Sequence, residues 1–155
     1  MFKTNSLCRK AAVVAGIMTA TFTTPAWAGD IFVSVTSVRS AEGTVLACLW
    51  FSGWGFPNCE EGRDNIKIIK TPALQGTVNF TFEGVPDGTY AISVAHDQNN
   101  DGVLERHKFL KYPLEGAGLS NYNEPPRFVP LHHSATFKAS GQVTEIRIPM
   151  HYPPE

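Results

Sequence analysis

The chain lacks the features that mark several common classes of protein. It has no excess of basic charge, with 13 Lys and Arg against 14 Asp and Glu, whereas a nucleic-acid-binding face needs such an excess. It has only 3 cysteines and no C-x-x-C pair, which argues against a redox motif or a zinc site. After Gly29, no stretch has the period of a long amphipathic helix, and no internal repeat or low-complexity run is present. These absences exclude a helical bundle and a nucleic-acid-binding protein.

The first 28 residues have the composition of an export signal. Basic residues begin it, an apolar segment follows at Ala11–Phe22, and Pro25–Ala28 ends in an A-x-A cleavage pattern. The apolar segment is shorter than the roughly 20 residues that a transmembrane helix needs. This favours a cleaved signal over an uncleaved anchor. We therefore predict a Sec-exported protein, periplasmic or secreted, in which residues 1–28 are a signal peptide and residues 29–155 form one domain.

Removal of this signal changes both the charge and the cysteine count. It takes three basic residues and no acid, which leaves a net charge of −4 with histidine neutral. That balance argues against nucleic-acid partners and against docking on anionic lipid, and we expect no membrane insertion of the mature chain. Cys8 also leaves, so Cys48 and Cys59 remain. In an oxidising compartment, this even pair predicts a disulfide across a turn rich in Gly and Pro.

Short β-branched or alternating stretches account for most of the mature chain. They predict seven strands, at residues 31–38, 44–51, 65–71, 77–82, 90–96, 135–139 and 143–148. The first two are expected to pair as a hairpin, and the second, nearly all apolar, to be buried on both faces. Seven short strands without a helix predict an all-β fold, a seven-stranded antiparallel β-sandwich. Its core is expected to contain Phe80, Phe82, Tyr90, Ile92 and Val94.

The most distinctive stretch follows the expected strand 90–96. His96–Glu105 has an oxygen ligand at every second position, Asp97, Asn99 and Asp101, and then Gly102. This is the first half of an EF-hand-type calcium loop, in which a tight turn lets short side chains converge on one cation. The spacing predicts a Ca²⁺ site.

The rest of the calcium ligand set is less regular. The carbonyl of Val103 is expected to supply an oxygen, and Glu105 falls at the ninth position of the loop. The twelfth position is Lys108 rather than the usual bidentate Glu, so Glu115 is the candidate to complete the shell. We expect an affinity of about 10⁻⁴–10⁻³ M, the range of extracellular modules. The alternative is an Asx-rich turn whose side chains cap their own backbone.

The histidines are weak candidates for metal ligands. His96 and His107 flank the acidic loop, but a site of hard oxygen ligands does not favour imidazole. We expect His96 to position the loop or the segment around Glu115 through a hydrogen bond. His132 and His133 are adjacent, so on a strand they would point to opposite faces and could not easily share a metal.

Two irregular segments remain between the expected strands. Residues 52–64 contain Trp54 and Phe56, which form either an exposed aromatic platform or a lid folded onto the core, and burial of such residues favours the lid. Residues 106–131 contain four prolines, which is too broken for a helix or a long strand and too long for an idle connector. We expect residues 106–131 to form the surface for an unknown ligand or protein partner.

Two motifs resemble a bacterial secreted family, domain-of-unknown-function family 2141. Its G-T-Y-A strand followed by H-D-x-N-x-[ND]-G-x-[LM]-[DE] is matched by Gly88–Ala91 and His96–Glu105. Its second hallmark, G-x-P-x-E-G-x-G-x-S-N, is matched by Tyr112–Asn121, with Lys111 where the family usually has glycine. The similarity covers nearly all of residues 30–149. The resemblance implies a transthyretin-like or carboxypeptidase-regulatory-like sandwich, and it implies no activity.

Two functions remain open at this point. The first is an exported, non-catalytic binding or structural module, stiffened by Ca²⁺ in the Asp97–Glu105 loop, with no catalytic residue. The alternative is a small metal-dependent periplasmic hydrolase, with Asp97, Glu105, Glu115 and His96 around a metal-bound water. The alternative requires an open metal position and a pocket beside it. The sandwich fold does not decide between them, because it hosts many functions.

Overall fold

Two stacked β-sheets account for most of the described chain. The structure is a computed structural model, and it describes residues 28–59, 63–102, 104, 106–108, 113–124 and 130–154. The elements are β1 (Ala28–Val38), β2 (Thr44–Trp50), β3 (Ile66–Pro72), β4 (Gly76–Pro86), β5 (Gly88–Asp97), β6 (Gly116–Leu119), α1 (His132–Ala135), β7 (Phe137–Ala139) and β8 (Val143–Pro149). The predicted signal peptide lies outside these residues except for Ala28, which pairs with Pro86. Cleavage after Ala28 therefore stays a prediction.

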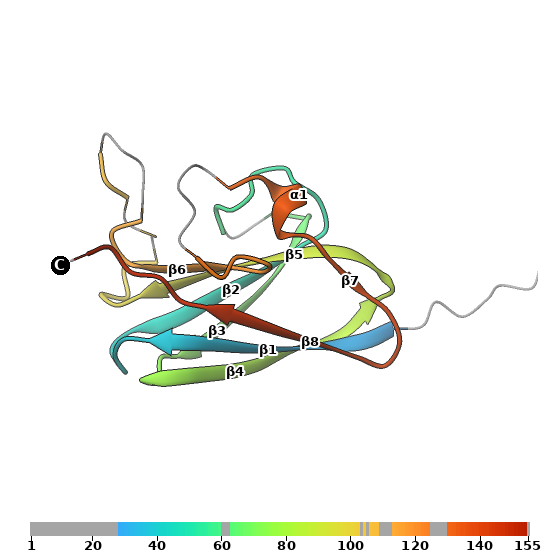
Figure 1. Cartoon of the computed structure of the whole chain (residues 1–155), viewed down its shortest axis with the longest axis horizontal. Coiled ribbons are helices and arrows are strands. Elements are labelled where there is room, and N and C mark those ends of the chain that lie inside the picture. Colours follow the sequence, from blue (N-terminus) through green and yellow to red (C-terminus); the bar gives the residue numbers. More distant parts are fainter. Residues whose placement is uncertain are drawn as a thin grey trace, which may run out of the picture.

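The sheets have different sizes and are shown stacked in Figure 1. The smaller has the order β4-β1-β8, and the larger has the order β3-β2-β5-β6, with β7 paired to one end of β5. The predicted all-β sandwich is confirmed. The described residues form eight strands rather than seven, and β1 runs parallel to β8 while the other pairs are antiparallel.

The predicted hairpin between the first two strands is wrong. β1 pairs with β4 and β8, whereas β2 lies between β3 and β5 in the other sheet. The physical reason is the burial of β2 on both of its faces, which only a central strand of a covered sheet can achieve. The connection turns at Gly43, which has a φ of +75°, and the Asp97 carbonyl occupies the space where a Cβ would lie.

Alternating side chains of both sheets fill the space between them. Val33 of β1 lies opposite Phe80 of β4 and beside Ile146 of β8, and all three face the larger sheet. The predicted core residues are confirmed as members of this layer. One of them, Phe80, is only partly buried.

A second apolar cluster covers the outer face of the larger sheet, and we call it the aromatic cap. It contains the buried residues Cys48, Trp50, Ala91 and Ala135 with the partly buried Phe56, Cys59, Ile66, Ile68 and Tyr122. The predicted Cys48–Cys59 disulfide is present, with a Cα–Cα distance of 5.9 Å. Because this cap covers its outer face, β2 is buried on both sides, as predicted.

Two elements differ from the sequence prediction in the last third of the chain. Residues 106–131 include β6, which pairs with β5 and is largely buried. Its small residues allow this: a Cβ at Gly118 would lie 2.7 Å from the Pro149 carbonyl oxygen. His132–Ala135 forms the single turn of α1 rather than a strand, and β7 begins only at Phe137. The argument that His132 and His133 would point to opposite faces of a strand therefore does not apply to them.

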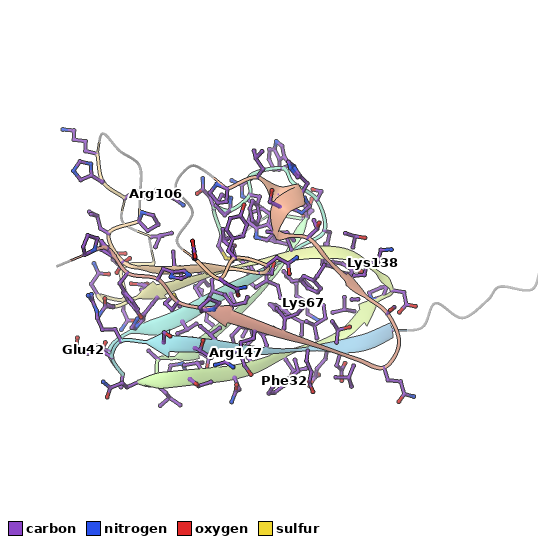
Figure 2. All side chains as sticks on the ribbon, viewed as in Figure 1. Phe32, Glu42, Lys67, Arg106, Lys138 and Arg147 are labelled. Carbon is purple, nitrogen blue, oxygen red and sulfur yellow. A yellow bond between two sulfur atoms is a disulfide. The ribbon has the colours of Figure 1, made fainter. Side chains whose placement is uncertain are left out.

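The sandwich is tied together at both sides. The chain after β8 pairs with β6, because Ala117 and His151 exchange backbone hydrogen bonds of 2.8 and 2.9 Å. On the other side, the Lys67 ammonium of β3 donates to the Glu83 carbonyl of β4 at 2.6 Å. Figure 2 shows Glu42, in the turn between β1 and β2, and Lys138 of β7 at opposite ends of the molecule.

Candidate functional site

The acidic loop, Asp97–Glu105, follows directly from the end of β5, a strand paired on both sides. His96 and Asp97, the last two residues of β5, are 0% and 8% exposed. Their backbones pair with Val45 and Thr44 of β2, and His96 also pairs with Gly116 of β6. A loop anchored in this way begins from a fixed position.

Asp97 organises the loop through its carboxylate. Its Oδ1 accepts a hydrogen bond from the Asp101 N–H at 3.2 Å, and its Oδ2 accepts one from the Gly102 N–H at 2.8 Å. Asn99 Oδ1 accepts from the same Asp101 N–H at 3.0 Å. Asn100 and Gly102 have positive φ values of 58° and 78°, which give the sharp bends that this wrapping requires. The oxygens of Asp97 and Asn99 therefore converge on one point of the backbone.

Two further side-chain hydrogen bonds hold the loop, one within it and one to β2. Asn99 Nδ2 donates to Asp101 Oδ2 at 2.9 Å, and the Thr44 hydroxyl donates to Asn100 Oδ1 at 2.7 Å. These contacts are those of an Asx-rich turn. Asp97 accepts two hydrogen bonds from the backbone of this turn, whereas an ionised carboxylate can accept about four hydrogen bonds or metal contacts.

Glu115 reaches the loop from just before β6. Its Oε1 accepts a hydrogen bond from the Gln98 N–H at 3.1 Å, and the residue is 7% exposed. The structure thus places Asp97, Asn99 and Asp101 in one turn and Glu115 against the backbone of Gln98, the second residue of that turn. The other two predicted ligands, Val103 and Glu105, lie outside the described residues. Within the described part of the chain, no group of three or more His, Cys, Asp or Glu side chains is arranged to hold a metal ion.

His96 is the centre of a buried hydrogen-bond network. Its Nε2 lies 2.7 Å from the Glu42 carbonyl oxygen, and its Nδ1 lies 2.7 Å from the Tyr152 hydroxyl. Because a carbonyl only accepts, Nε2 carries a proton and donates to Glu42. The Tyr152 hydroxyl in turn accepts from the Arg39 N–H at 2.9 Å. Both ring nitrogens of His96 thereby have a hydrogen-bond partner, and we call His96, Glu42, Tyr152 and Arg39 the histidine network.

The histidine network touches the acidic loop through Arg39. The Arg39 guanidinium lies 4.5 Å from the centre of the Tyr152 ring and donates to Gln98 Oε1 at 3.1 Å. Burial raises the pKa of Tyr152, although the N–H and the charge of Arg39 act in the opposite direction. A Cβ at Gly116 would lie 2.5 Å from the Tyr152 ring. We expected a hydrogen bond of His96 to position the loop or the Glu115 segment. Its side chain bonds instead to Glu42 and Tyr152, and Arg39 makes the contact with the loop.

Other residues of the two sequence motifs hold the backbone. The Tyr90 hydroxyl donates to the Pro86 carbonyl at 2.7 Å, a corner of the kind found in other sandwiches. A Cβ at Gly88 would lie 2.9 Å from that hydroxyl oxygen. The buried Ser120 hydroxyl donates to the Ala135 carbonyl at 2.6 Å, and the Asn121 amide donates to the next carbonyl. These motif residues therefore build the fold rather than a reactive centre.

The aromatic cap places the two candidate platform residues differently. Phe56 packs edge-to-face on Trp50 and on His132, with ring centres 5.4 Å apart in both pairs, so it is a lid. Trp54 is 72% exposed, and the guanidinium of Arg63 lies 4.9 Å from its ring. Burial and the charge of His133 lower the pKa of His132. The lid interpretation is confirmed for Phe56 and is wrong for Trp54.

Sequence reasoning missed Arg39, Glu42 and Tyr152. Tyr152 lies 56 residues from its His96 partner, and neither Arg39 nor Tyr152 belongs to a motif. The Glu42 contact uses a backbone carbonyl, which any residue could supply. Only Gly116 could have pointed to this network in the sequence. A glycine within a motif indicates that another group approaches the backbone closely, and here that group is the Tyr152 ring.

Comparison with known proteins gives one match. The model of the family described as "Uncharacterized protein conserved in bacteria (DUF2141)" matches residues 33–147. The search of curated proteins and the search of solved structures returned no match. Among the described residues, no helix is long and apolar enough to cross a membrane.

Proposed function

We propose, from the premise that this chain belongs to the DUF2141 family, that it is an exported, non-catalytic binding or structural module. Its Asp97–Glu105 loop binds Ca²⁺, which stiffens the loop beside the ligand surface. The family carries no established activity, so the proposal rests on the chemistry of the loop and its surroundings.

The observation that carries the proposal is the gathering of hard oxygen ligands at one loop. Asp97, Asn99 and Asp101 alternate along the tight turn, and Glu115 lies against its second residue. Carboxylate and amide oxygens are the ligands that Ca²⁺ prefers. A mostly buried carboxylate such as Asp97 is costly unless it is paired. Backbone N–H groups supply part of that pairing, and a cation would supply the rest.

The histidine network supports a non-catalytic role. A general base needs a ring nitrogen within reach of a substrate proton. His96 is fully buried, and both of its ring nitrogens are bonded to Glu42 and Tyr152. This favours a role of His96 in the fold and counts against the hydrolase alternative, which placed His96 beside a metal-bound water.

The ligand surface that we propose is the exposed part of residues 106–131. β6 is removed from this surface because its residues are largely buried between β5 and the chain after β8. Leu114 and Leu131 remain, 40% and 60% exposed. Leu114 directly precedes Glu115, so a stiffened loop would fix its position. The disulfide supports export, because such bonds persist in oxidising compartments.

The test is a calcium titration of the metal-stripped protein, followed by thermal unfolding and by calorimetry. Because Ca²⁺ binds only the folded loop, stability should rise by about 1.4 kcal/mol at ten times the dissociation constant. Magnesium should stabilise much less, because its small octahedral shell fits a crowded carboxylate cage poorly.

Three variants separate a calcium site from a simple turn. Asp101→Asn keeps the shape and removes one charge, so it should weaken binding, and Asp97→Ala should abolish it. Glu115→Gln should weaken binding if this carboxylate completes the shell. Asp64→Ala changes an exposed acid outside the loop and is the matched control. Absence of calcium binding at millimolar concentration would show that the loop is only an Asx-rich turn.

A further inference from the structure

The free edge of β4 differs from the other edges of the two sheets. In the described residues, β4 pairs only with β1, so its other side has no strand beside it. Figure 1 shows β4 along the lower rim of the molecule. Sheet edges are normally protected by charge, by proline or by a covering segment. Whether β4 has such protection can be judged against β3 and β8.

The two other long edges are protected. β3 carries Lys67 and Lys70, and lysine on an edge strand opposes pairing with another chain. β8 carries Glu145 and Arg147 on its exposed face, and the chain that follows it turns to pair with β6 through His151. Neither edge offers a long uncharged strand.

β4 has none of these protections over most of its length. Gly76–Phe82 reads Gly-Thr-Val-Asn-Phe-Thr-Phe, without a charge or a proline. Such composition favours pairing between strands. Its pairing with β1 is regular from Thr77 to Phe82, and the register shifts at both ends of this stretch, beside Gly76 and around Glu83 and Gly84. Protection begins where the regular strand ends.

Two further observations indicate that the edge is open. A Cβ at Gly76 would meet no atom within 4 Å, so no side chain of the described residues lies over the start of the strand; the contact of Lys67 with the Glu83 carbonyl lies beyond its other end. Phe80 points toward the core side and packs edge-to-face on Phe82, yet it is only partly buried. A partner strand beside β4 would complete the burial of Phe80.

We propose that the partner is a second copy of this chain, added antiparallel to β4 across a twofold axis. The reason is self-complementarity. In an antiparallel pair centred on one residue, positions equally distant from the centre lie opposite each other on the same face. An uncharged strand therefore meets its own copy without repulsion, which would not hold for β3 with its two lysines.

The register of this pair follows from the limits of the strand. The uncharged stretch Gly76–Phe82 is centred on Asn79, and the bulge after Phe82 prevents longer pairing. With Asn79 opposite its own copy, Thr77 lies opposite Thr81 of the second copy, and Val78 lies opposite Phe80. Polar residues thus meet polar ones on the outer face, and apolar residues meet apolar ones on the core side. The β4-β1-β8 sheet then continues through the dimer.

Sedimentation equilibrium of the purified protein gives the first test. A reversible monomer–dimer equilibrium is expected between about 1 μM and about 1 mM. If the protein is a monomer at every concentration, the proposal is wrong, even if β4 pairs with a strand of some other protein.

Asn79→Lys tests the surface. It places two ammonium groups opposite each other at the twofold axis, so the dissociation constant should rise at least about tenfold. Asn123→Lys makes the same change of charge after β6, at an exposed position, and should leave the dissociation constant unchanged. A circular dichroism melt verifies that both variants fold. An unchanged dissociation constant in folded Asn79→Lys overturns the proposal.

Asn79→Cys tests the register and does not depend on the first variant. The Cα atoms of opposed residues in an antiparallel pair are about 4.5–5.5 Å apart, which suits a disulfide. Mild oxidation should link two copies through residue 79, as identified by mass spectrometry. Lys70→Cys places the thiol on the β3 edge and should not cross-link. Equal cross-linking of the two variants contradicts the register.

Discussion

The two ends of β5 are held in place by different kinds of interaction. At its start, Ala91 pairs with Trp50, and the aromatic cap and its disulfide cover the outer face of both strands. At its end, His96 pairs with Val45, and the histidine network and the acidic loop surround the strand. Apolar burial is non-directional and scales with area, whereas the histidine network depends on a few oriented hydrogen bonds. The cap should therefore lose stability according to the apolar area removed, whereas the network should lose it when a single hydrogen-bond partner is removed.

Replacement of Trp50 by Ala in the aromatic cap should cause the largest loss of unfolding free energy. The side chain is fully buried, and its Nε1 donates to the Ser93 hydroxyl at 2.8 Å. Loss of a buried Trp costs about 3–5 kcal/mol of unfolding free energy. Trp54→Ala is the matched control, because the exposed Trp54 ring contacts a cation and should cost less than about 1 kcal/mol. Equal losses for the two variants in urea unfolding would contradict the cap as described.

His96→Leu tests the opposite end of β5. It keeps most of the side-chain volume but leaves the Glu42 carbonyl and the Tyr152 hydroxyl without this partner. Two such groups cost about 2–4 kcal/mol of unfolding free energy. The exposed His133→Leu is the control and should stay within about 0.5 kcal/mol. A double-mutant cycle with Tyr152→Phe should give a clear coupling energy, and a value near zero would remove this hydrogen bond from our account.

Removal of the disulfide sharpens the comparison. Changing both Cys48 and Cys59 to Ala opens a loop with a sequence separation of 11 and should cost about 2–3 kcal/mol of unfolding free energy. Amide hydrogen exchange should accelerate in residues 51–58, whereas residues 96–102 should keep their protection. Equal acceleration in both regions would show that the two ends of β5 are not independent.

The smallest expected effect is a loss of stability in acid through His132, which packs against Phe56 of the cap. Burial and His133 hold the pKa of His132 below 6.5, so the unfolded chain binds the proton more readily than the folded chain. Stability is therefore complete above about pH 6.5 and is lost as the pH falls from there through the lower pKa of the folded state. His132→Phe should reduce the difference in melting temperature between about pH 7.5 and pH 5.5. Part of the difference should remain, because burial also lowers the pKa of His151. A difference equal to that of the unaltered protein would contradict this role.

The periodicity of the sequence predicted most of the strands, but it did not predict which strands pair with each other. Val78, Phe82, Ile92 and Val94 alternate in the sequence and are buried in the structure, because the period of a strand is local. The pairing of β1 with β8 joins residues more than a hundred positions apart, and no local pattern specifies it. β6 was missed because Gly116 and Gly118 lack strand propensity, and their value lies in the close approach of Tyr152 and Pro149.

In the candidate site too, local features could be predicted from the sequence and long-range contacts could not. The spacing of Asp97, Asn99 and Asp101 is a local pattern, and the structure shows these side chains wrapped around one turn. The proximity of Glu115 to the loop was inferred from ligand counting alone, and a hydrogen bond now joins it to Gln98. The partners of His96 come from the turn after β1 and the chain after β8. They meet only after both sheets have formed.

The parallel pairing of β1 with β8 also determines when the fold can be completed. β1 is the middle strand of its sheet, and one of its two neighbours is residues 143–149. Until those residues leave the ribosome, β1 can pair only with β4, and its other edge remains unmatched. Pairings of such high contact order form slowly, in milliseconds to seconds for all-β domains, because loop closure costs entropy before any contact compensates it. A chain with this topology therefore completes its smaller sheet only after residues 143–149 have emerged, and until then it stays accessible to the export machinery that we propose.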